Sequence, residues 1–499
     1  KINGITNLGS LQLIYDPNNR YIEFEDQTVA NICITNWGDG VGITEAQAAA
    51  VSGSLTIQFA NTNITSFDEL RYFKKMTLSS NNADNLFDGC SNLERIHLPE
   101  TSNQLTLGAY AFDDCSNLKE IHFHSGFNSS AKYQAFRGCT SLTKIYFDSL
   151  DQLLNSTHGE LVASNRWTMP FRASGGGHIY INDVELTDLV IPVGITRIPS
   201  IFAYCNYITS VTIPSTVTSI ATHAFYRSGL TGSLIIPSSV TSIGSSAFNG
   251  CTGLTGDIII PPSVTNIFDN AFSQLGDVGT IDIQSSTVSF GSGVFIQTFM
   301  TNLYINSSIS QATISTTATV GWVGKGDGTL MINGNLSLSE FFQRLRFRHY
   351  VIKGNLIVSK GAFLSSTGTT HSVRISGNYV GNATSGGIFG STTAGSNIEF
   401  IEVNGTITEG MHNSYKPTHH HILHLRYNGI ATETPSQVGA ELDVTTKIYI
   451  GTGESEAGDQ AILNQYLHED SAWSAYADKL DLWYNYDGEY KIPPTIPNV

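Results

Sequence analysis

The sequence predicts an α+β repeat solenoid: a right-handed superhelix with short parallel strands on its concave face and a small helical cap at each end. Three observations predict this fold. A phenylalanine recurs at a nearly constant interval, short segments of alternating apolar and polar residues follow it, and helical spacing of apolar residues is confined to the two ends. A chain of 499 residues is long for a single globular core, whereas stacked repeats do not need a single central core.

The repeat reads roughly I-x-x-x-A-F-x-x-C-x-x-L-x-x-I-x-I-P-x-x-V-T-x, as in IGSSAFNGCTGLTGDIIIPPSVTN. In the unit that ends LKEIHF, the alternation predicts a strand with Ile121 and Phe123 pointing inward. Each phenylalanine is expected to fill the space between neighbouring units, since no unit closes a core alone. These phenylalanines recur about every 23 residues; they are Phe87, Phe112, Phe136, Phe202, Phe225, Phe248, Phe272 and Phe295.

The stretches SVTSIGSSAFNGCTGL and TIPSTVTSIATHAF resemble the BspA-like leucine-rich repeats of bacterial surface proteins, over about residues 74–305. The resemblance implies a non-enzymatic, exported protein that is displayed at the cell surface or secreted. It also implies binding of an extracellular protein or glycan, from a host or a bacterium, through the concave face. A carbohydrate-binding accessory protein and a structural surface component without a specific ligand are the alternatives. Because the chain begins at Lys1, we expect a missing leader that would distinguish lipid anchoring from secretion.

The remaining segments flank or interrupt the array. Residues 1–73 are expected to form a helical cap with two capping boxes, TEAQ (44–47) and SFDE (66–69). Units occupy 74–147 and 201–305, and residues 148–200 are an insertion with a hairpin turn at Asn182–Asp183. Residues 451–499 are expected to form the C-terminal cap, a helix whose apolar positions are Leu463, Tyr466, Leu467, Trp473, Tyr476 and Leu480.

Residues 306–450 are interpreted as divergent repeat units, and a separate β-sandwich is the alternative. The glycines of five similar segments keep the period: Gly334, Gly354, Gly377, Gly405 and Gly429. Gly-Asn is expected to make here the turn that Pro-Ser makes earlier, through a positive φ or a tight bend.

Composition excludes several classes of function. Only 14% of the residues are charged, and a net charge of −16 disfavours nucleic acid as a partner. No apolar stretch approaches the ~20 residues of a membrane helix. We expect a monomer without a cofactor.

Cys90, Cys115 and Cys139 take one position in successive units, so they are either disulfide-linked or a ladder of buried thiols. The thiol ladder is favoured, because Ser228 takes the same position without a partner.

No catalytic motif emerges: there is no G-x-S-x-G, and the glycine-rich segments lack Gly-Lys-Ser/Thr.

The segment NWGDGVGITEAQ resembles a shortened EF-hand or dockerin loop. Asp39 is the one acid that remains at its ligand positions, and Gln47 takes the final position, so calcium binding is not expected. No metal site is predicted. His419, His421 and His424 are weak candidates, because consecutive histidines point in different directions.

One residue of each strand lies between the two inward positions and is predicted to be exposed on the concave face. Arginines and aromatic residues there suit a protein interface, and a flat aromatic row also suits sugar rings; ordinary cross-strand pairs are the alternative. The predicted ligand-binding residues are His97, His122, Tyr146, Tyr304, Arg374, Arg426 and Tyr449. The row also includes Thr212, Ile235, Ile259, Asp282, Met331, Val351 and Glu402.

Overall fold

The computed structural model describes residues 20–55, 59–78, 85–100, 107–124, 135–155, 177–310, 322–338, 345–358, 372–380, 398–405, 422–427, 447–451, 454–467, 477–478 and 480–485. The chain divides into two compact units, Lys1–Thr187 (unit 1) and Asp188–Val499 (unit 2). Within the described ranges, no helix has both the length and the apolar character that a membrane span requires.

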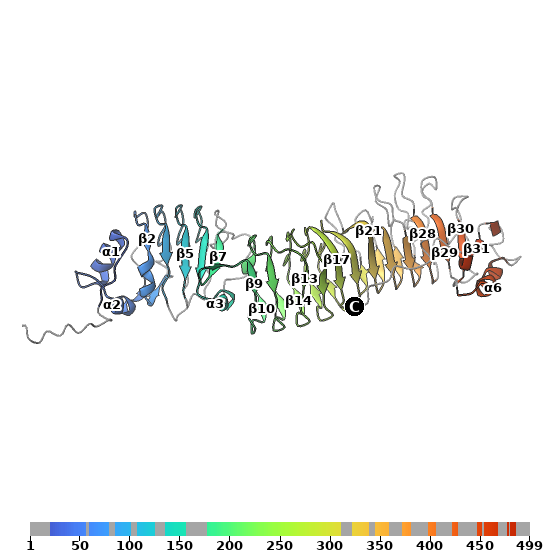
Figure 1. The fold of residues 1–499 in the computed structure, drawn as a ribbon, viewed down its shortest axis with the longest axis horizontal. Helices are drawn as coiled ribbons and strands as arrows, with labels where there is room; N and C mark the ends of the chain where they lie inside the picture. Colours follow the sequence, from blue (N-terminus) through green and yellow to red (C-terminus); the bar gives the residue numbers. More distant parts are fainter. Residues whose placement is uncertain are drawn as a thin grey trace, which may run out of the picture. The chain divides into compact units, whose positions relative to one another are not determined.

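Unit 1 begins with two helices, which cover the first coils of a parallel sheet (Figure 1). Its described elements are α1 (Gln27–Trp37), α2 (Glu45–Ala50), β1 (Ser52–Ser54), β2 (Ser66–Phe67), the 3₁₀ helix η2 (Asp68–Tyr72), β3 (Lys75–Thr77), β4 (Arg95–His97), β5 (Glu120–Phe123), β6 (Lys144–Phe147), α3 (Leu150–Asn155), β7 (His178–Ile181) and β8 (Val184–Glu185).

The capping residues explain where the N-terminal helices start. The Asp26 carboxylate accepts hydrogen bonds from the N–H groups of Thr28 and Val29 at the start of α1. The TEAQ box is confirmed at α2. Its Thr44 hydroxyl accepts from the Gln47 N–H, and the Gln47 side chain accepts from the Thr44 N–H.

The second predicted capping box, SFDE at 66–69, is wrong. Ser66 and Phe67 instead form β2, which pairs with β4. This pairing places Phe67 in register with Ile96, where its side chain is fully buried. No side chain caps η2, and the carboxylate of Glu69 accepts instead from the N–H of Glu25. The first solenoid coil therefore lies within the segment that the sequence assigned to the N-terminal cap.

One sheet of unit 1 has the order β2-β4-β5-β6-β7-β8, and β1 pairs with β3 separately. All these pairs are parallel except β7–β8. The predicted hairpin is confirmed: Asn182 and Asp183 both have positive φ, as a two-residue hairpin turn requires. Because β7 pairs in parallel with β6, the hairpin extends the sheet of the repeats.

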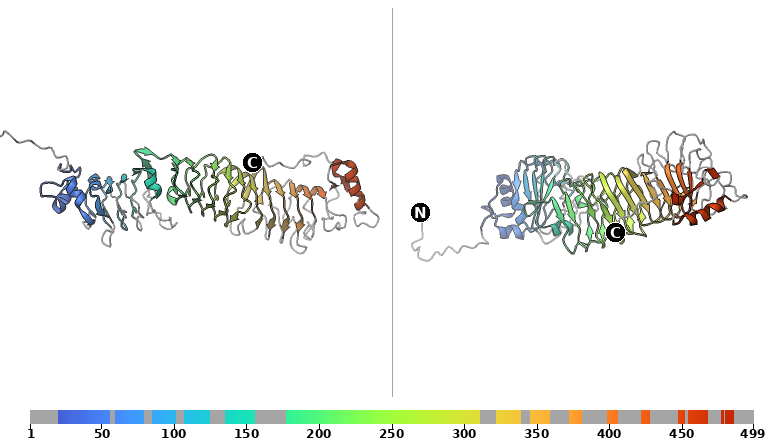
Figure 2. Two further views of the ribbon diagram at one scale, coloured as in Figure 1. Left: turned by 90° about the horizontal axis from the view of Figure 1, so that it is seen from below. Right: turned by 45° about the vertical axis from the view of Figure 1, so that its right-hand side comes forward.

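Unit 2 is a longer stack of coils closed by one helix (Figure 2). Its described elements are β9 (Asp188–Val190), β10 (Arg197–Ile198), η4 (Ser200–Phe202), β11 (Ser210–Thr212), β12 (Ser219–Ile220), β13 (Leu234–Ile235), β14 (Ser242–Ile243), β15 (Ile258–Ile260), β16 (Asn266–Ile267), β17 (Asp277–Ile283), β18 (Ser289–Phe290), β19 (Phe299–Ile305), β20 (Ile309–Ser310), β21 (Trp322–Ile332), β22 (Leu336–Leu338), β23 (Leu345–Arg346), β24 (His349–Ile352), β25 (Leu356–Val358), β26 (Ser372–Ile375), β27 (Tyr379–Val380), β28 (Ile398–Val403), β29 (Ile422–Tyr427), β30 (Lys447–Ile450), α6 (Glu456–Tyr466), β31 (Leu480–Leu482) and η7 (Trp483–Asn485).

The described strands of unit 2 pair only in parallel. The main sheet runs β13-β15-β17-β19-β21-β24-β26-β28-β29-β30-β31, with β23 also paired to β21. A second set of strands forms the sheets β10-β12-β14-β16-β18 and β20-β22-β25-β27, and β9 pairs with β11. A β-sandwich of hairpins would be antiparallel. Residues 306–450 therefore continue the solenoid wherever the structure describes them.

The repeating phenylalanines form a buried stack within each unit, as predicted. Neighbouring rings have centroids 5.1–6.0 Å apart and planes within 6–19° of parallel. All eight predicted phenylalanines are fully buried. The sequence analysis missed Phe59, whose ring lies 5.5 Å from that of Phe87 and begins the stack.

The cysteine position supplies a hydrogen-bond donor to the preceding coil. The thiols of Cys90, Cys115 and Cys139 each donate to the carbonyl of a stacked phenylalanine at 3.0 Å. The Thr298 hydroxyl donates to the equivalent carbonyl of Phe272 at 2.7 Å. All six cysteines are buried and free, so the ladder of thiols is confirmed. A hydroxyl replaces the thiol readily because either group satisfies the buried carbonyl.

The Gly-Asn turns of the later coils stack on one another. None of Gly334, Gly354, Gly377 and Gly405 has a positive φ, so that part of the expectation is wrong. The Asn335 side chain instead accepts from the N–H of Asn355 at 2.7 Å, and the Asn355 side chain accepts from the N–H of Asn378 at 2.8 Å. These asparagines link one coil to the next.

The C-terminal cap contains α6, whose Leu463 and Tyr466 are buried. Leu467 is exposed at the helix end. Leu480 lies in a strand rather than a helix, because β31 pairs with β30 and alternates buried leucines around Asp481. The expected positions Trp473 and Tyr476 lie outside the described residues.

Candidate functional site

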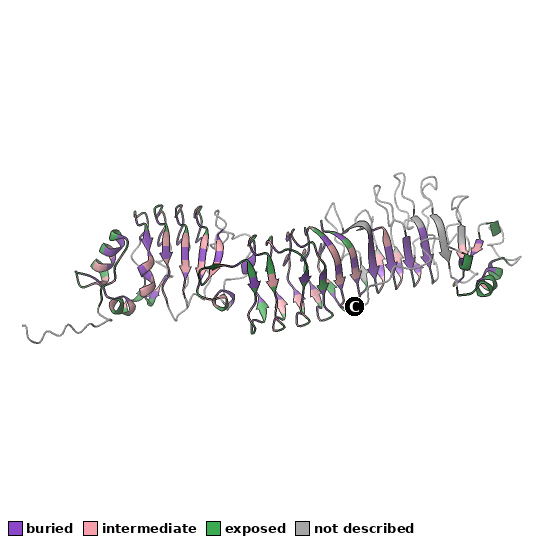
Figure 3. Ribbon diagram, in the orientation of Figure 1, coloured by how far each residue is buried: buried purple, intermediate pink, exposed green. Residues whose placement is uncertain are grey.

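The predicted row of outward-facing residues exists in unit 1. Strand register places His97 beside His122, His122 beside Tyr146, and Tyr146 beside Tyr180. Residues that precede them in the strands, such as Ile121, are fully buried, whereas the row itself is half-buried (Figure 3). The sequence analysis missed Tyr180 because it treated its hairpin as an insertion. The likeness of HIYI to KIYF was the available signal.

These rings stack face to face along the sheet. Ring centroids lie 3.7 Å apart for His97 and His122, 4.0 Å for His122 and Tyr146, and 5.0 Å for Tyr146 and Tyr180. The first two pairs are within 10° of parallel. Rings this close cover one another's faces, so the row presents ring edges to solvent. It therefore offers nitrogen and hydroxyl groups rather than a flat surface for sugar rings.

Polar groups lie on both sides of the stacked rings. On one side, Glu120 is in register with Arg95 and Lys144, and the Lys144 Nζ lies 2.7 Å from the Glu120 Oε1. On the other side, His124 Nε2 lies 3.1 Å from His97 Nδ1, and His124 Nδ1 lies 3.1 Å from Asp148 Oδ1. The outer face of this sheet thus combines paired charges with the edges of aromatic rings.

The stacked histidines are neutral at physiological pH. Burial, with added contributions from the neighbouring His122 and His124, lowers the pKa of His97 to about 2. Burial likewise lowers the pKa of His122 to about 4, with an added contribution from His124. These histidines of the row therefore offer hydrogen-bonding groups rather than positive charge.

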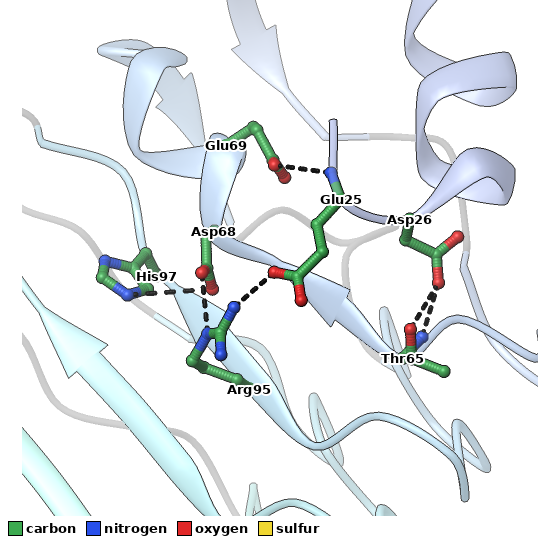
Figure 4. Close-up of polar contacts among 7 residues, drawn as sticks. All are labelled: Glu25, Asp26, Thr65, Asp68, Glu69, Arg95 and His97. Carbon is green, nitrogen blue, oxygen red and sulfur yellow. Dashed lines mark hydrogen bonds and ion pairs between the residues drawn. The ribbon is translucent and has the colours of Figure 1, made fainter. Parts of the chain in front are cut away.

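Carboxylate side chains connect the N-terminal cap to the first coil through hydrogen bonds and ion pairs, next to this row (Figure 4). Arg95 donates to Asp68 Oδ2 at 2.7 Å and also pairs with Glu25. His97 Nε2 lies 3.7 Å from Asp68 Oδ1, so the same cluster ends the row of rings.

Asp26 joins the cap to the coil directly, and its loss should loosen that contact. Besides capping α1, its carboxylate accepts from the N–H of Thr65 at 2.7 Å and from the Thr65 hydroxyl at 3.0 Å. Burial alone would raise the pKa of Asp26, but the bonds from Thr65, Val29 and Thr28 outweigh it and lower the pKa. We expect Asp26→Ala to destabilise the cap by about 2 kcal/mol at pH 7.

The sign of the pH dependence follows from the lowered pKa. The carboxylate stabilises the folded cap above its unfolded pKa of about 4, and the stabilisation is lost as pH falls through the folded pKa. Hydrogen exchange of the α1 amides, corrected for intrinsic rates, should therefore separate variant from wild type at pH 7 and converge in acid. Glu23→Ala is the control, since Glu23 is exposed. A difference that persists unchanged in acid would contradict the assignment.

In unit 2 the predicted row is in register but becomes buried along the sheet. Ile235 is 70% exposed, and Tyr304 is half-buried beside Met331. From β21 to β28 the row is buried, and Arg374 is only 6% exposed (Figure 3). The predicted exposure is therefore wrong for Met331, Val351, Arg374 and Glu402. Arg374 pairs with Glu402 in the next strand, and its guanidinium lies 5.0 Å from the ring centre of Phe400, which accounts for a buried cation here.

The C-terminal end of this face is covered by an aromatic residue. The Trp483 ring lies 5.6 Å from that of Phe400 and 6.0 Å from that of Tyr449. Tyr449, a predicted binding residue, is thus packed against the cap. Arg426 is in register between Glu402 and Tyr449 on β29, but its side chain lies outside the described residues. The open part of the row in unit 2 is its N-terminal part, around Ile235, Ile259 and Tyr304.

Comparison with known proteins identifies the repeat. A family model for a BspA type leucine rich repeat region matches residues 54–161 and 176–301, in six copies. These two segments are BspA-type leucine-rich repeats. No protein of curated function matches the sequence.

Several solved structures are similar to this chain. A leucine-rich repeat protein from Bacteroides ovatus ATCC 8483 is 16% identical, with 74% of this chain and 86% of that chain covered and a TM-score of 0.30. A leucine rich cell surface protein from Faecalibacterium prausnitzii A2-165 is 17% identical, covering 70% and 82%, with a TM-score of 0.23. A leucine-rich repeat protein from T. pallidum is 22% identical, covering 43% and 67%, with a TM-score of 0.15.

The structure describes the backbone of one of the three weak metal-ligand candidates. His419 and His421 lie outside the described residues, and His424 belongs to β29. Among the residues that the structure describes, no group of three or more His, Cys, Asp or Glu side chains could hold a metal ion.

Asp39, the acid of the EF-hand-like segment that precedes α2, accepts hydrogen bonds within the loop. Its Oδ1 accepts from the N–H groups of Val41 and Gly42, and its Oδ2 accepts from the Tyr21 hydroxyl at 2.6 Å. The hydroxyl of Tyr21 and these N–H groups lower the pKa of Asp39 to about 2. The Asp39 carboxylate is therefore satisfied by donors of the loop and of Tyr21.

Proposed function

We propose that this BspA-type chain is a non-enzymatic, extracellular recognition protein that binds a protein partner through the outer face of its parallel sheets. One observation carries the proposal: the inward residues repeat from coil to coil, whereas the outward residue changes. His97, His122 and Tyr146 give unit 1 a row of polar ring edges. In unit 2 the row has the exposed Ile235 and Ile259, followed by Asp282 and the half-buried Tyr304. Such variation on a constant frame suits a specific interface.

Export from the cell is part of the proposal. The low charge content of 14% and the membership of the repeat in the BspA type support a protein placed at the cell surface or secreted. Digestion of intact cells with a protease should then remove the chain, while a cytosolic marker stays intact. Full protection of the chain until the cells are lysed would contradict the extracellular location.

Binding is tested with immobilised matrix proteins as probes. We expect retention of the chain on fibronectin or fibrinogen, and at least a tenfold weaker retention for the double variant Tyr146→Ala/Tyr304→Ala. The matched control is Thr218→Ala/Thr241→Ala, because these exposed threonines lie next to strands β12 and β14 of the other sheet. Equal retention of the double variant and the wild type would refute binding through the outer face, and retention of neither would refute these partners.

A further inference from the structure

An asparagine followed by a glycine lies at the turn that begins the stack of glycine turns in unit 2. Asn333 and Gly334 follow β21, and the Asn333 side chain is exposed. Glycine has no Cβ atom, so the peptide nitrogen that follows such an asparagine can approach the side-chain amide carbon without a steric clash. Attack of that nitrogen on the amide is the first step in the spontaneous loss of ammonia from asparagine. The surroundings of Asn333 therefore determine whether this turn is chemically stable.

The N–H of Gly334 lacks the hydrogen bond that fixes each later glycine of the stack. In the later turns the glycine N–H donates to the glycine carbonyl of the preceding turn, at 3.1 Å for Gly354 and at 3.0 Å for Gly377 and Gly405. Within the part of the chain that the structure describes, the N–H of Gly334 has no hydrogen-bond partner. The nitrogen that attacks is therefore not held by a bond that the attack must first break.

Gly334 is the first glycine of the stack, since the preceding coil has Ser307 at this place. The peptide groups on both sides of Gly334 are fixed. The N–H of Asn333 donates to the carbonyl of Ile305 at 2.8 Å, and the N–H of Asn335 donates to a serine hydroxyl of the preceding coil at 2.9 Å. The free N–H is thus confined to the residue that follows the exposed asparagine.

One hydrogen bond holds the Asn333 side chain, whose Nδ2 donates to Asn306 Oδ1 of the preceding coil at 2.5 Å. This bond opens by rotation of the side chain alone. A backbone bond between two glycine turns opens only if the coils move apart. Asn404 is also exposed and followed by glycine, but the N–H of Gly405 makes such a backbone bond. Asn333 therefore reaches the geometry of attack more easily than Asn404.

A third Asn-Gly pair is protected at both groups. Asn249 is buried, and its Nδ2 donates to Ser273 Oγ at 2.6 Å. The N–H of Gly250 donates to the Ser273 carbonyl at 3.0 Å. Among the described residues the dipeptide therefore occurs in three different surroundings, and only the surroundings of Asn333 leave the following nitrogen without a hydrogen bond.

We propose that Asn333 is a modification site, at which the chain converts asparagine to aspartate and isoaspartate without an enzyme. The Gly334 nitrogen gives its proton to solvent and bonds to the Asn333 Cγ. The bond from Cγ to Nδ2 breaks, and the departing group takes up a proton and leaves as ammonia. Water then adds to one of the two carbonyl carbons of the cyclic imide. One opening gives aspartate, and the other gives isoaspartate, whose backbone is one carbon longer.

Isoaspartate lengthens the turn on which the next coil stacks. The carbonyl of Gly334 accepts the N–H of Gly354, and the side chain of Asn335 accepts the N–H of Asn355. Hydrogen exchange of these two amides should therefore accelerate after conversion. This modification goes beyond the proposed recognition of a protein, because it needs no partner.

The test is incubation of the full folded chain in mildly alkaline buffer, followed by peptide mapping that separates asparagine, aspartate and isoaspartate. Each rate is divided by the rate of the same site in urea, which corrects for the local sequence. We expect Asn333 to convert at least about fivefold faster than Asn404, the factor that one hydrogen bond adds to the barrier. Asn249 should convert most slowly. Asn306→Ala should accelerate the conversion of Asn333 further, because it releases the side chain.

The matched control is Asn333→Ser, because Ser376 takes the same turn position two coils later. After the same incubation this variant should keep the hydrogen-exchange protection of Gly354, whereas the wild type should lose part of it. Equal corrected rates at Asn333 and Asn404 would overturn the proposal. So would an Asn333 that stays intact while the chain in urea converts, or an equal loss of protection in Asn333→Ser and the wild type.

Discussion

Replacing Phe112 with alanine is expected to lower the free energy of unfolding of unit 1 by about 3–5 kcal/mol. Phe112 is fully buried between Phe87 and Phe136, with ring centroids 5.1 and 5.4 Å away. Its carbonyl also accepts the thiol of Cys139. Removing the ring leaves a cavity that neither neighbour can fill, because each is fixed by its own turn.

Loss of Phe112 should act on nearby coils only. In a solenoid each coil contacts its neighbours, so hydrogen exchange should accelerate in β4, β5 and β6, while β13 to β17 of unit 2 keep their protection. The control is Phe299→Ala in unit 2, whose side chain is 43% exposed and which should cost less than about 1 kcal/mol. Equal losses for the two variants would show that the stacked phenylalanines do not hold the coils together.

The repeating part of the fold could be predicted from the sequence because one local residue pattern occurs many times. The phenylalanine interval, the inward isoleucines and the cysteine position each recur. A wrong prediction from one unit can therefore be corrected by comparing that unit with the next. Phe59 escaped notice because Thr62 stands where the motif has cysteine. Its hydroxyl donates to the Phe59 carbonyl of its own turn at 2.5 Å, whereas the Cys90 thiol reaches the same carbonyl from the next coil.

The exposure of the outward row was harder to predict, because it depends on residues far away in the chain. Strand register determines that Arg374 lies in the outward row, and the alternation of the strand predicts this correctly. Its burial does not follow from the alternation of its own strand, because all four residues of β26 are buried, the outward ones included. In the same way, Trp483 covers Phe400 from a segment some 80 residues later, which no local pattern reveals.

The ring geometry of unit 1 was also beyond the sequence. The alternation places His97, His122 and Tyr146 in one row, but it does not determine whether the ring faces or the ring edges meet the solvent. Side-chain rotation, limited by Asp68 and His124 on either side of His97, decides this. The aromatic content of a row is therefore a poor guide to sugar binding.

Gly354→Ala should destabilise unit 2 by about 3 kcal/mol, near the upper end of the cost of overpacking. A Cβ atom at this position would lie 2.7 Å from the backbone carbon and oxygen of Gly334 in the preceding coil. The same holds one coil later, where a Cβ on Gly377 would lie 2.7 Å from the Gly354 oxygen. Backbone atoms cannot move aside as a flexible side chain can, so the clash must separate the coils.

Separation of the coils would also break the asparagine ladder, since the bond from the Asn355 N–H to Asn335 spans the same gap. Urea unfolding of unit 2 and hydrogen exchange in β22 and β25 should both report the loss. Lys353→Ala is the control, because Lys353 is the exposed residue next to Gly354 in the same turn and should change stability by less than about 0.5 kcal/mol. If Gly354→Ala proved as mild as this control, glycine would not be required for close stacking, and the regular glycines of residues 306–450 would need another cause.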